Sequence, residues 1–396
     1  MEKPINLFIK LGLGILFSMM VRALQIFSAY KWYFLVAVLH FCILIFITRN
    51  GVLLTYDSID FYAIAHNFRE SFQLTHQNGE ILKARPPFYP ILISIMAYSK
   101  TIQENNILIF WPILVSIVNL SVFYQFIKTF IQNEILKKWS FAMFALGSPI
   151  MLCTVYFWSE NIFIALVMLL IISLKGIENE SNNSFIPFVI CLILIPLTRY
   201  IGIVLILPVV VYFVFFCRKN PIKLVLVISA SFFPLVFWQL RNIYLTGNGP
   251  QREFVNKAWW QSSYSAIEVM SAWYIPPQLP FVLKLVFCLV LAVIFVVVFI
   301  QSITKKAYFN AFLVLFFLFY IAFVVIIHSF IHFAEEVDNR FLAPVYPVFL
   351  VLMSMFFEKY LTKNQSKLLI LRNICLVITL LYVLVRIFYN ANQWKL

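Results

Sequence analysis

Long apolar segments alternate with short polar ones along almost the whole chain. A transmembrane helix needs about 20 mostly apolar residues, and within a bilayer only helices and closed barrels satisfy their own backbone hydrogen bonds. We identify eleven apolar runs, at about residues 33–48, 107–127, 139–157, 161–174, 185–197, 200–217, 222–245, 279–301, 308–330, 341–357 and 368–388. The pattern therefore predicts an all-α polytopic membrane protein with about 11 transmembrane helices.

Two further apolar segments are too short or too interrupted to count as spans. Residues 86–99 would rise only about 21 Å as a helix, so we expect an interfacial or re-entrant helix there. Residues 7–27 hold an eleven-residue apolar stretch between Lys10 and Arg22, which is more typical of a surface helix. We therefore expect residues 1–32 to form an N-terminal interfacial segment.

The lysine-rich loops predict the orientation of the spans. Basic clusters lie between spans at residues 128–138, 218–223, 305–306 and 359–367. If all eleven runs cross the bilayer, these clusters fall on one face, which the positive-inside rule makes cytoplasmic. Two long polar segments then face outward, the first external loop at 49–106 and the second external loop at 246–278.

Composition and charge exclude several classes of protein. Of the 396 residues, 63% are hydrophobic and 12% charged, whereas a soluble domain keeps about 25% of its residues charged. Disorder is excluded as well, because it requires low hydrophobicity. The basic residues behind the net charge of +14 lie singly or in short clusters between apolar runs, which does not fit nucleic-acid binding. The six cysteines form no CxxC pair, so we expect neither a disulfide framework nor a cysteine-ligated metal.

Arginines collect near the predicted outer face, where the positive-inside rule does not require them. They are Arg49, Arg69, Arg85, Arg199, Arg241, Arg252, Arg340 and Arg386. Guanidinium groups bind phosphate oxygens bidentately and stay charged when partly buried. Two explanations weigh equally for any single arginine: it binds phosphate in a site, or it snorkels to lipid headgroups.

The first external loop contains a predicted amphipathic helix. Apolar side chains recur at helical spacing, at Phe61, Ile64, Ala65, Phe68 and Phe72. This pattern indicates a helix that lies on the membrane surface. Asp57 stands at its start, where we expect it to serve as the N-cap.

Acidic residues are scarce, which makes two of them candidates for chemistry. The chain has three aspartates, Asp57, Asp60 and Asp338, and all lie on the predicted outer face. A carboxylate placed there, beside low-dielectric surroundings, can act as a general base. The structural alternative is that Asp57 caps the helix and Asp60 favours its positive end, and from these residues alone it is the stronger of the two.

Several short motifs together resemble a known family. Asp57 follows the first span, Phe61 and Ala65 come at intervals of four, and the loop ends in Arg85-Pro86-Pro87-Phe88-Tyr89-Pro90. This arrangement resembles the GT-C membrane glycosyltransferases, most closely the branch of the protein O-mannosyltransferases and lipid A aminoarabinose transferases. Later fragments fit in order: Ser159-Glu160, Thr198-Arg199-Tyr200-Ile201-Gly202, Leu240-Arg241-Asn242 and Arg340-Phe341-Leu342-Ala343-Pro344. Ser58 departs from the pattern, because many relatives have an acidic residue there.

The resemblance implies a single GT-C-like transmembrane domain over residues 1–396 that acts as an inverting glycosyltransferase. Its donor would be a sugar linked to a polyprenyl phosphate, and its acceptor a lipid, glycan or protein. The multi-pass protein would lie in a bacterial inner (plasma) membrane with its active site on the periplasmic face. The implied site residues are Asp57 as catalytic base, Glu160 as a second catalytic carboxylate, and Asp60, Arg85, Tyr89, Arg199, Arg241 and Arg340 as residues that bind substrate and phosphate. Carboxylates hold a divalent metal ion in some relatives, and this alternative stays open here.

Other interpretations are weighed beside this one. A transporter or flippase of lipid-linked glycans would also combine many spans with arginines, but there is no repeat between the halves and few charges lie deep in the spans. A non-catalytic assembly subunit would keep the scaffold without the base. A nucleotide donor has no support, because the glycines form no GxGxxG or P-loop pattern.

Two clusters in the external segments have competing explanations. A zinc site is one interpretation of His328, His332, Glu335, Glu336 and Asp338, but there is no HExxH, so we prefer a polar cluster that borders the cavity. In the second external loop, an interfacial aromatic belt is favoured over sugar or isoprenoid stacking for Trp259, Trp260, Tyr264, Trp273 and Tyr274.

Overall fold

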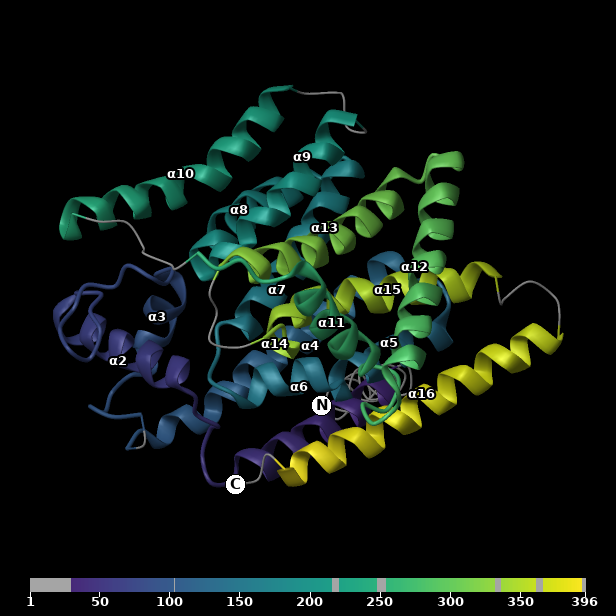
Figure 1. Cartoon of the computed structure of the whole chain (residues 1–396), viewed down its shortest axis with the longest axis horizontal. Coiled ribbons are helices and arrows are strands. Elements are labelled where there is room, and N and C mark those ends of the chain that lie inside the picture. Colours follow the sequence, from purple (N-terminus) through teal and green to yellow (C-terminus); the bar gives the residue numbers. More distant parts are fainter. Residues whose placement is uncertain are drawn as a thin grey trace, which may run out of the picture.

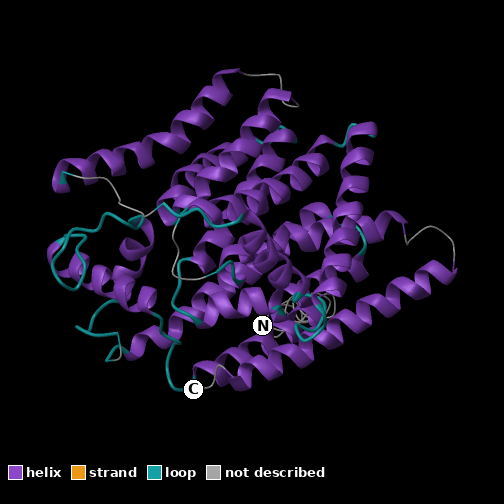
Figure 2. Cartoon of the chain, viewed as in Figure 1, coloured by secondary structure: helices purple, strands orange, loops and turns teal. Residues whose placement is uncertain are grey.

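A computed structural model of the chain describes residues 30–102, 104–215, 221–247, 254–331, 336–360 and 366–393. Within these ranges the regular structure is helical, and extended segments form only isolated bridges (Figure 2). The surface helix expected at 7–27 lies outside the described residues.

The helices follow one another with short connections, apart from the two long external segments. In chain order they are Tyr30–Thr48, α2 (Tyr56–Ser71), α3 (Phe88–Ile93), α4 (Phe110–Phe130), α5 (Glu134–Leu146), α6 (Ser148–Val155), α7 (Glu160–Glu178), α8 (Phe185–Thr198), the 3-10 helix η4 (Tyr200–Leu205), α9 (Ile206–Phe215), α10 (Pro221–Thr246), α11 (Trp259–Ser271), α12 (Phe281–Thr304), α13 (Tyr308–Phe330), α14 (Asn339–Leu342), α15 (Tyr346–Tyr360) and α16 (Ser366–Gln393).

The predicted polytopic helical fold is confirmed. Nine helical segments in the described part of the chain are long and apolar enough to cross a membrane, and two shorter apolar helices, Phe185–Thr198 and Tyr200–Phe215, match the fifth and sixth runs. The segment 86–99 forms only α3 and a following 3-10 turn, so it is too short to span, as expected. A six-residue helix rises about 9 Å, against a hydrocarbon core of about 30 Å.

The third run is divided by a glycine. Gly147 has extended backbone angles and separates α5 from α6. A Cβ atom at this position would lie 2.5 Å from the carbonyl oxygen of Met143 and 2.8 Å from the hydroxyl oxygen of Tyr346. Only glycine permits this close approach. The break lets the chain turn within the helical core and then reach the site at the start of α7.

Central and peripheral helices differ in burial. In the segments Glu134–Val155 and Asn339–Lys359, 89% and 78% of the most apolar window is buried, against 22% in α12. In Figure 1, α10 and α16 lie along opposite edges of the molecule. The core is largely aromatic, and the rings of Phe123 and Phe144 stack 3.9 Å apart. The peripheral helices expose leucine, isoleucine and valine, as expected where lipid replaces water as the solvent.

The basic clusters lie together at one end of the helices. Glu358, near the end of α15, accepts a hydrogen bond of 2.7 Å from the backbone of Asn133 in the α4–α5 turn. Lys305 and Lys359 line one common pocket. Figure 1 shows α2 and α3 at the opposite end, on the left. Three of the four clusters are therefore on one face, as eleven crossings require, while the cluster at 218–223 lies mostly outside the described residues.

Candidate functional site

The start of α2 positions the first carboxylates, and its cap is not the one expected. Thr55 is the N-cap and forms a capping box with Ser58, so the prediction that Asp57 caps this helix is wrong. The reason is that Ser58 follows Thr55 by three residues. The Ser58 hydroxyl accepts a hydrogen bond from the backbone N–H of Thr55, and the Thr55 hydroxyl accepts one from the backbone N–H of Ser58. Trp158 also donates to the Thr55 hydroxyl, at 2.8 Å. The carboxylate of Asp57 is consequently available to the arginines.

The apolar stripe of α2 packs inside the protein. Phe61, Ile64 and Ala65 are buried, and the Phe61 ring meets that of Tyr89 in α3 at 5.0 Å. Phe72, in contrast, is 83% exposed and takes left-handed backbone angles that end the helix. The stripe thus packs α2 against α3 and the start of α4, so the expectation that this face lies on the membrane surface is wrong.

Six predicted site residues form one chain of alternating charge, in the order Asp60, Arg85, Asp57, Arg340, Glu160 and Arg199. Arg85 contacts Asp60 at 3.3 Å and Asp57 at 2.7 Å. Arg340 contacts Asp57 at 2.6 Å and Glu160 at 2.9 Å, and Glu160 also pairs with Arg199. With three carboxylates and three guanidinium groups, this ion-pair network is formally neutral.

Helix starts and breaks supply the charged groups of the network. Glu160 is the first residue of α7, and Arg199 stands in extended conformation between α8 and η4. Arg340 lies in α14, and the N-cap of this helix is Asp338. The carboxylate of Asp338 accepts a hydrogen bond of 3.0 Å from the backbone N–H of Arg340. The guanidinium of Arg340 also lies over the ring of Trp158, 4.9 Å from its centroid. Backbone geometry and aromatic packing therefore aim these side chains at one point.

The carboxylates differ sharply in exposure. The side chain of Asp57 is 25% exposed, whereas that of Glu160 is 1% exposed and is engaged by two arginines. Burial acts to raise the pKa of Asp57, but the guanidinium groups of Arg85 and Arg340 outweigh it and hold the pKa below its ordinary value. Asp57 is thus a charged, accessible carboxylate, while Glu160 offers almost no surface to a ligand.

Two predicted site residues lie outside this network. Arg241 donates at 3.0 Å to the carbonyl of Leu82 and packs on the ring of Trp238. It therefore fastens the end of the first external loop, close to Arg85 in sequence. Tyr89 is fully buried, with its ring near those of Phe61 and Trp111. Within the described part of the chain, neither side chain forms an ion pair or a hydrogen bond with Asp57.

His76 also belongs to the site, although no pattern in the sequence indicates it. Its Nδ1 lies 2.7 Å from Asp60, so it extends the network beyond Arg85. No motif marks this position, because His76 comes from a polar loop whose fold depends on contacts with α2. Trp158 was also missed, although it directly precedes the Ser159-Glu160 fragment.

A metal centre is one interpretation of the polar residues described by the structure. Among them, no group of three or more histidine, cysteine, aspartate and glutamate residues is placed to hold a metal ion. His328 is buried, with Nδ1 2.9 Å from the carbonyl of Val324, and Glu336 pairs with Lys257. His332 and Glu335 lie outside the described residues. The carboxylates of the network are engaged by guanidinium groups, an arrangement that suits an anionic ligand better than a cation.

The aromatic residues of the second external loop do not form one set. Trp259 and Trp260 in α11 are 68% and 62% exposed. Trp273, however, is buried and packs edge-on against Tyr346 and Phe349. The expectation of a single interfacial belt is therefore wrong for Trp273, because the chain turns inward after α11.

The arrangement of the helices, compared with solved structures, shows a polytopic membrane protein with a GT-C-like fold. No family model and no curated protein matches the chain. Among solved structures, it is similar to ArnT from Cupriavidus metallidurans, a lipid A aminoarabinose transferase, in the apo state (TM-score 0.58) and bound to undecaprenyl phosphate (TM-score 0.57). Both comparisons show 12% sequence identity over 87% of this chain.

The similarity confirms the GT-C-like fold expected from the short motifs. It extends over 62% and 63% of the two ArnT chains, so this chain matches less than two thirds of their length.

Proposed function

We propose that the protein is an inverting glycosyltransferase that moves a sugar from a polyprenyl-phosphate donor to an acceptor at the external face of the membrane. The observation that carries this proposal is the ion-pair network, in which one accessible carboxylate, Asp57, lies between two arginines at the end of the helices. A one-step displacement needs a base that accepts the proton of the acceptor and positive groups that stabilise the leaving phosphate. A carboxylate between two arginines can supply both.

A lipid-linked donor fits the position of the site. Arg85 and Arg340 both pair with Asp57 near the start of α2, and Figure 1 shows α2 at the end of the molecule away from the basic clusters. A lipid headgroup at this end of the helices would meet these guanidinium groups. Guanidinium forks match the oxygens of a phosphate. A solved structure of ArnT contains undecaprenyl phosphate, which supports the same class of donor here. We assign Arg241 to positioning Arg85 through the loop carbonyl of Leu82, rather than to the phosphate itself.

Donor binding would release the catalytic base. The guanidinium groups of Arg85 and Arg340 are shared with Asp57, and a phosphate that pairs with them competes with the carboxylate. Loss of those ion pairs would raise the pKa of Asp57 and make it a better proton acceptor. Glu160, buried between Arg340 and Arg199, is assigned to holding these two arginines in place rather than to contact with the substrate.

The proposed reaction is a single displacement. A hydroxyl or amine of the acceptor attacks the anomeric carbon as Asp57 takes its proton. The bond between that carbon and the phosphate oxygen breaks, and polyprenyl phosphate leaves with the bonding electrons. The arginines stabilise the charge that develops on the phosphate. The configuration at the anomeric carbon is inverted, because the acceptor enters opposite the leaving group.

The experiment uses purified protein and a panel of radiolabelled polyprenyl-phosphate sugars, and it measures release of polyprenyl phosphate. We expect Asp57→Asn to insert and fold but to lower the rate by about 10²–10⁴-fold, the usual contribution of a general base. Glu70→Gln, the same acid-to-amide change at an exposed position of α2, is the matched control and should keep the wild-type rate.

Two results would contradict this proposal. Full activity in Asp57→Asn would remove the assignment of the base. Movement of a labelled donor across proteoliposomes without release of polyprenyl phosphate would favour the alternative, a flippase of lipid-linked glycans.

A further inference from the structure

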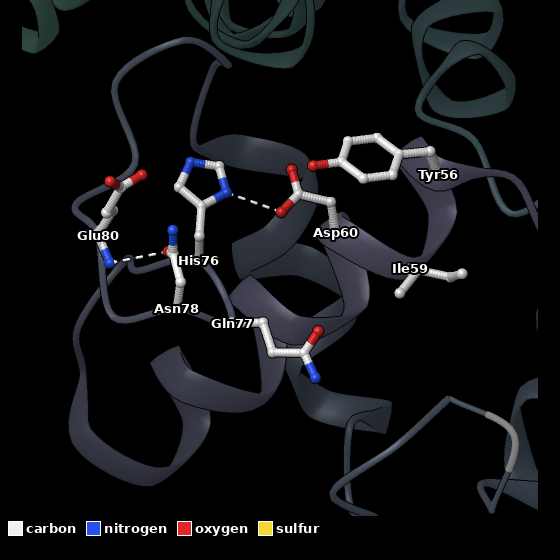
Figure 3. A pocket seen from close by; sticks show the side chains of 7 residues that line it. All are labelled: Tyr56, Ile59, Asp60, His76, Gln77, Asn78 and Glu80. Carbon is white, nitrogen blue, oxygen red and sulfur yellow. Dashed lines mark hydrogen bonds and ion pairs between the residues drawn. The ribbon is translucent and has the colours of Figure 1, made fainter.

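A polar pocket opens beside the ion-pair network, between α2 and the loop 74–82 (Figure 3). Its volume is about 460 Å³, within the range of about 300–1,000 Å³ that small-molecule sites occupy. Its lining residues are Tyr56, Ile59, Asp60, His76, Gln77, Asn78 and Glu80. Figure 3 shows the rings of Tyr56 and His76 on either side of Asp60.

The loop that forms one wall of the pocket is held by defined contacts. The backbone of His76 donates to the carbonyl of Glu80 at 2.8 Å, and Gly79 makes the turn with a φ of 82°. The side-chain amide of Asn67 in α2 donates at 3.1 Å to the carbonyls of both Thr75 and His76. The backbone of this wall is therefore held against α2 before any ligand arrives.

The chemistry of the lining suits a polyhydroxylated group. A sugar hydroxyl both donates and accepts hydrogen bonds, and carboxylate, amide and imidazole groups supply both complements. Within the described part of the chain, the side chains of Gln77 and Glu80 make no hydrogen bond with the protein. Tyr56 is 81% exposed and offers an aromatic face for the C–H side of a sugar ring.

The same lining disfavours the phosphate of the donor. Two carboxylates, Asp60 and Glu80, line the pocket, and no arginine or lysine does. An anion in this pocket would meet like charge. The phosphate is therefore directed to the arginines of the network, and the pocket is left for a different part of the reaction.

We propose that this pocket is the acceptor subsite and binds a sugar-like, polyhydroxylated group; the assignment rests on the proposed function. Asp60 joins the two regions, because one of its oxygens contacts His76 in the pocket and the other contacts Arg85 in the network. Asp57 and Asp60 stand three residues apart on α2, so their Cβ atoms are about 5–6 Å apart. A sugar ring bound beside Asp60 would therefore lie about one helical turn from Asp57, the proposed base.

The first experiment measures binding and needs no turnover. Saturation-transfer NMR on purified protein tests a panel of methyl glycosides in detergent, and the same sugars as glycolipid headgroups in nanodiscs. We expect at least one sugar to bind, and Tyr56→Ala or Glu80→Ala to weaken its binding about five- to tenfold. The matched controls are Tyr244→Ala, 87% exposed on α10, and Glu70→Ala, exposed on α2. Binding of free glycosides identifies a soluble acceptor, and binding of glycolipids alone identifies a lipid headgroup.

The second experiment separates acceptor from donor. For a sugar that binds, Tyr56→Ala and Glu80→Ala should raise the KM for the acceptor about tenfold and leave the KM for the polyprenyl-phosphate sugar unchanged. If no sugar in the panel binds, if the pocket variants bind as the controls do, or if the donor KM rises instead, the acceptor assignment is overturned. Sugar binding at this pocket without any donor cleavage would contradict the proposed glycosyltransferase while leaving the sugar site in place.

Discussion

At the scale of single residues, the decisive feature is how guanidinium groups are shared. Arg340 contacts both Asp57 and Glu160, and these two carboxylates differ from 25% to 1% in exposure. Under the proposed function, the arginines beside the exposed carboxylate can turn to a phosphate, whereas the buried carboxylate cannot be left unpaired without a large cost. The same pair of contacts thus separates a residue suited to react from one suited to position.

The depressed pKa of Asp57 predicts the acid limit of activity. Arg85 and Arg340 outweigh the desolvation that would raise this pKa. The carboxylate therefore stays charged at pH values below 3.8, the ordinary pKa of an aspartate. A base acts only when deprotonated, so kcat/KM falls only as the pH drops through that lowered pKa. We expect no limb due to Asp57 between about pH 5 and pH 8 in the wild type.

Removal of one arginine should move this limb upward. In Arg340→Gln the pKa of Asp57 rises, and the fall in kcat/KM begins at higher pH than in the wild type. The control is Arg69→Gln, because Arg69 lies on α2 with Asp57 but outside the network. This variant should leave the pH at which kcat/KM falls unchanged. The measurement is kcat/KM for polyprenyl phosphate release against pH. A wild-type limb near neutrality that disappears in Arg340→Gln would contradict the assignment.

At the scale of elements, helix starts and breaks build the site. Glu160 is the first residue of α7, and Arg199 lies between α8 and η4. Arg340 lies two residues after Asp338, the N-cap of α14. Such positions are where backbone groups lack helical partners, so polar side chains are stabilised there. The first loop obeys the same rule, with Thr55 as the cap of α2 and Trp158 bonded to that cap.

The cap of α2 should contribute to the stability of the protein. Thr55→Ala removes both the capping hydrogen bond and the acceptor for Trp158, so we expect a loss of about 0.5–2 kcal/mol in the free energy of unfolding. Thr55→Ser keeps the hydroxyl and should restore most of it. Thermal unfolding of both variants in the same detergent tests this. Equal melting temperatures for the two variants would show that the hydroxyl does not act as described.

At the scale of the whole molecule, charge is divided between two ends. The acidic and arginine residues of the network converge at the end that holds α2, and three lysine clusters lie at the other. Between a lysine cluster and the next network residue along the chain, an odd number of helices crosses the bilayer, and this places the two kinds of residue at opposite ends. The positive-inside rule then predicts that the lysine end faces the cytoplasm.

Single-cysteine labelling tests that orientation. In a variant without native cysteines, Gln77→Cys in the first external loop should react with a membrane-impermeant maleimide on intact cells. Lys305→Cys, at the opposite end, should react only after the membrane is permeabilised. The reverse pattern would place the site on the cytoplasmic face and contradict an external acceptor.

Much of the architecture could be predicted from the sequence. The eleven apolar runs reappear as helices because hydrophobicity over about 20 residues is a local property that the bilayer reads directly. Six of the eight expected site residues do meet, since their motifs mark helix ends on one predicted face.

The contacts that distinguish these residues from one another depend on how the helices pack. These contacts join positions that are far apart in the chain: Asp57 and Arg340 are 283 residues apart, and Glu160 and Arg340 are 180 residues apart. No local pattern indicates that Arg241 turns to a loop carbonyl, that Glu160 is buried, or that His76 meets Asp60. Apolarity is a sum over neighbours in sequence, whereas an ion pair depends on a distance of about 3 Å, which exists only once the helices are packed.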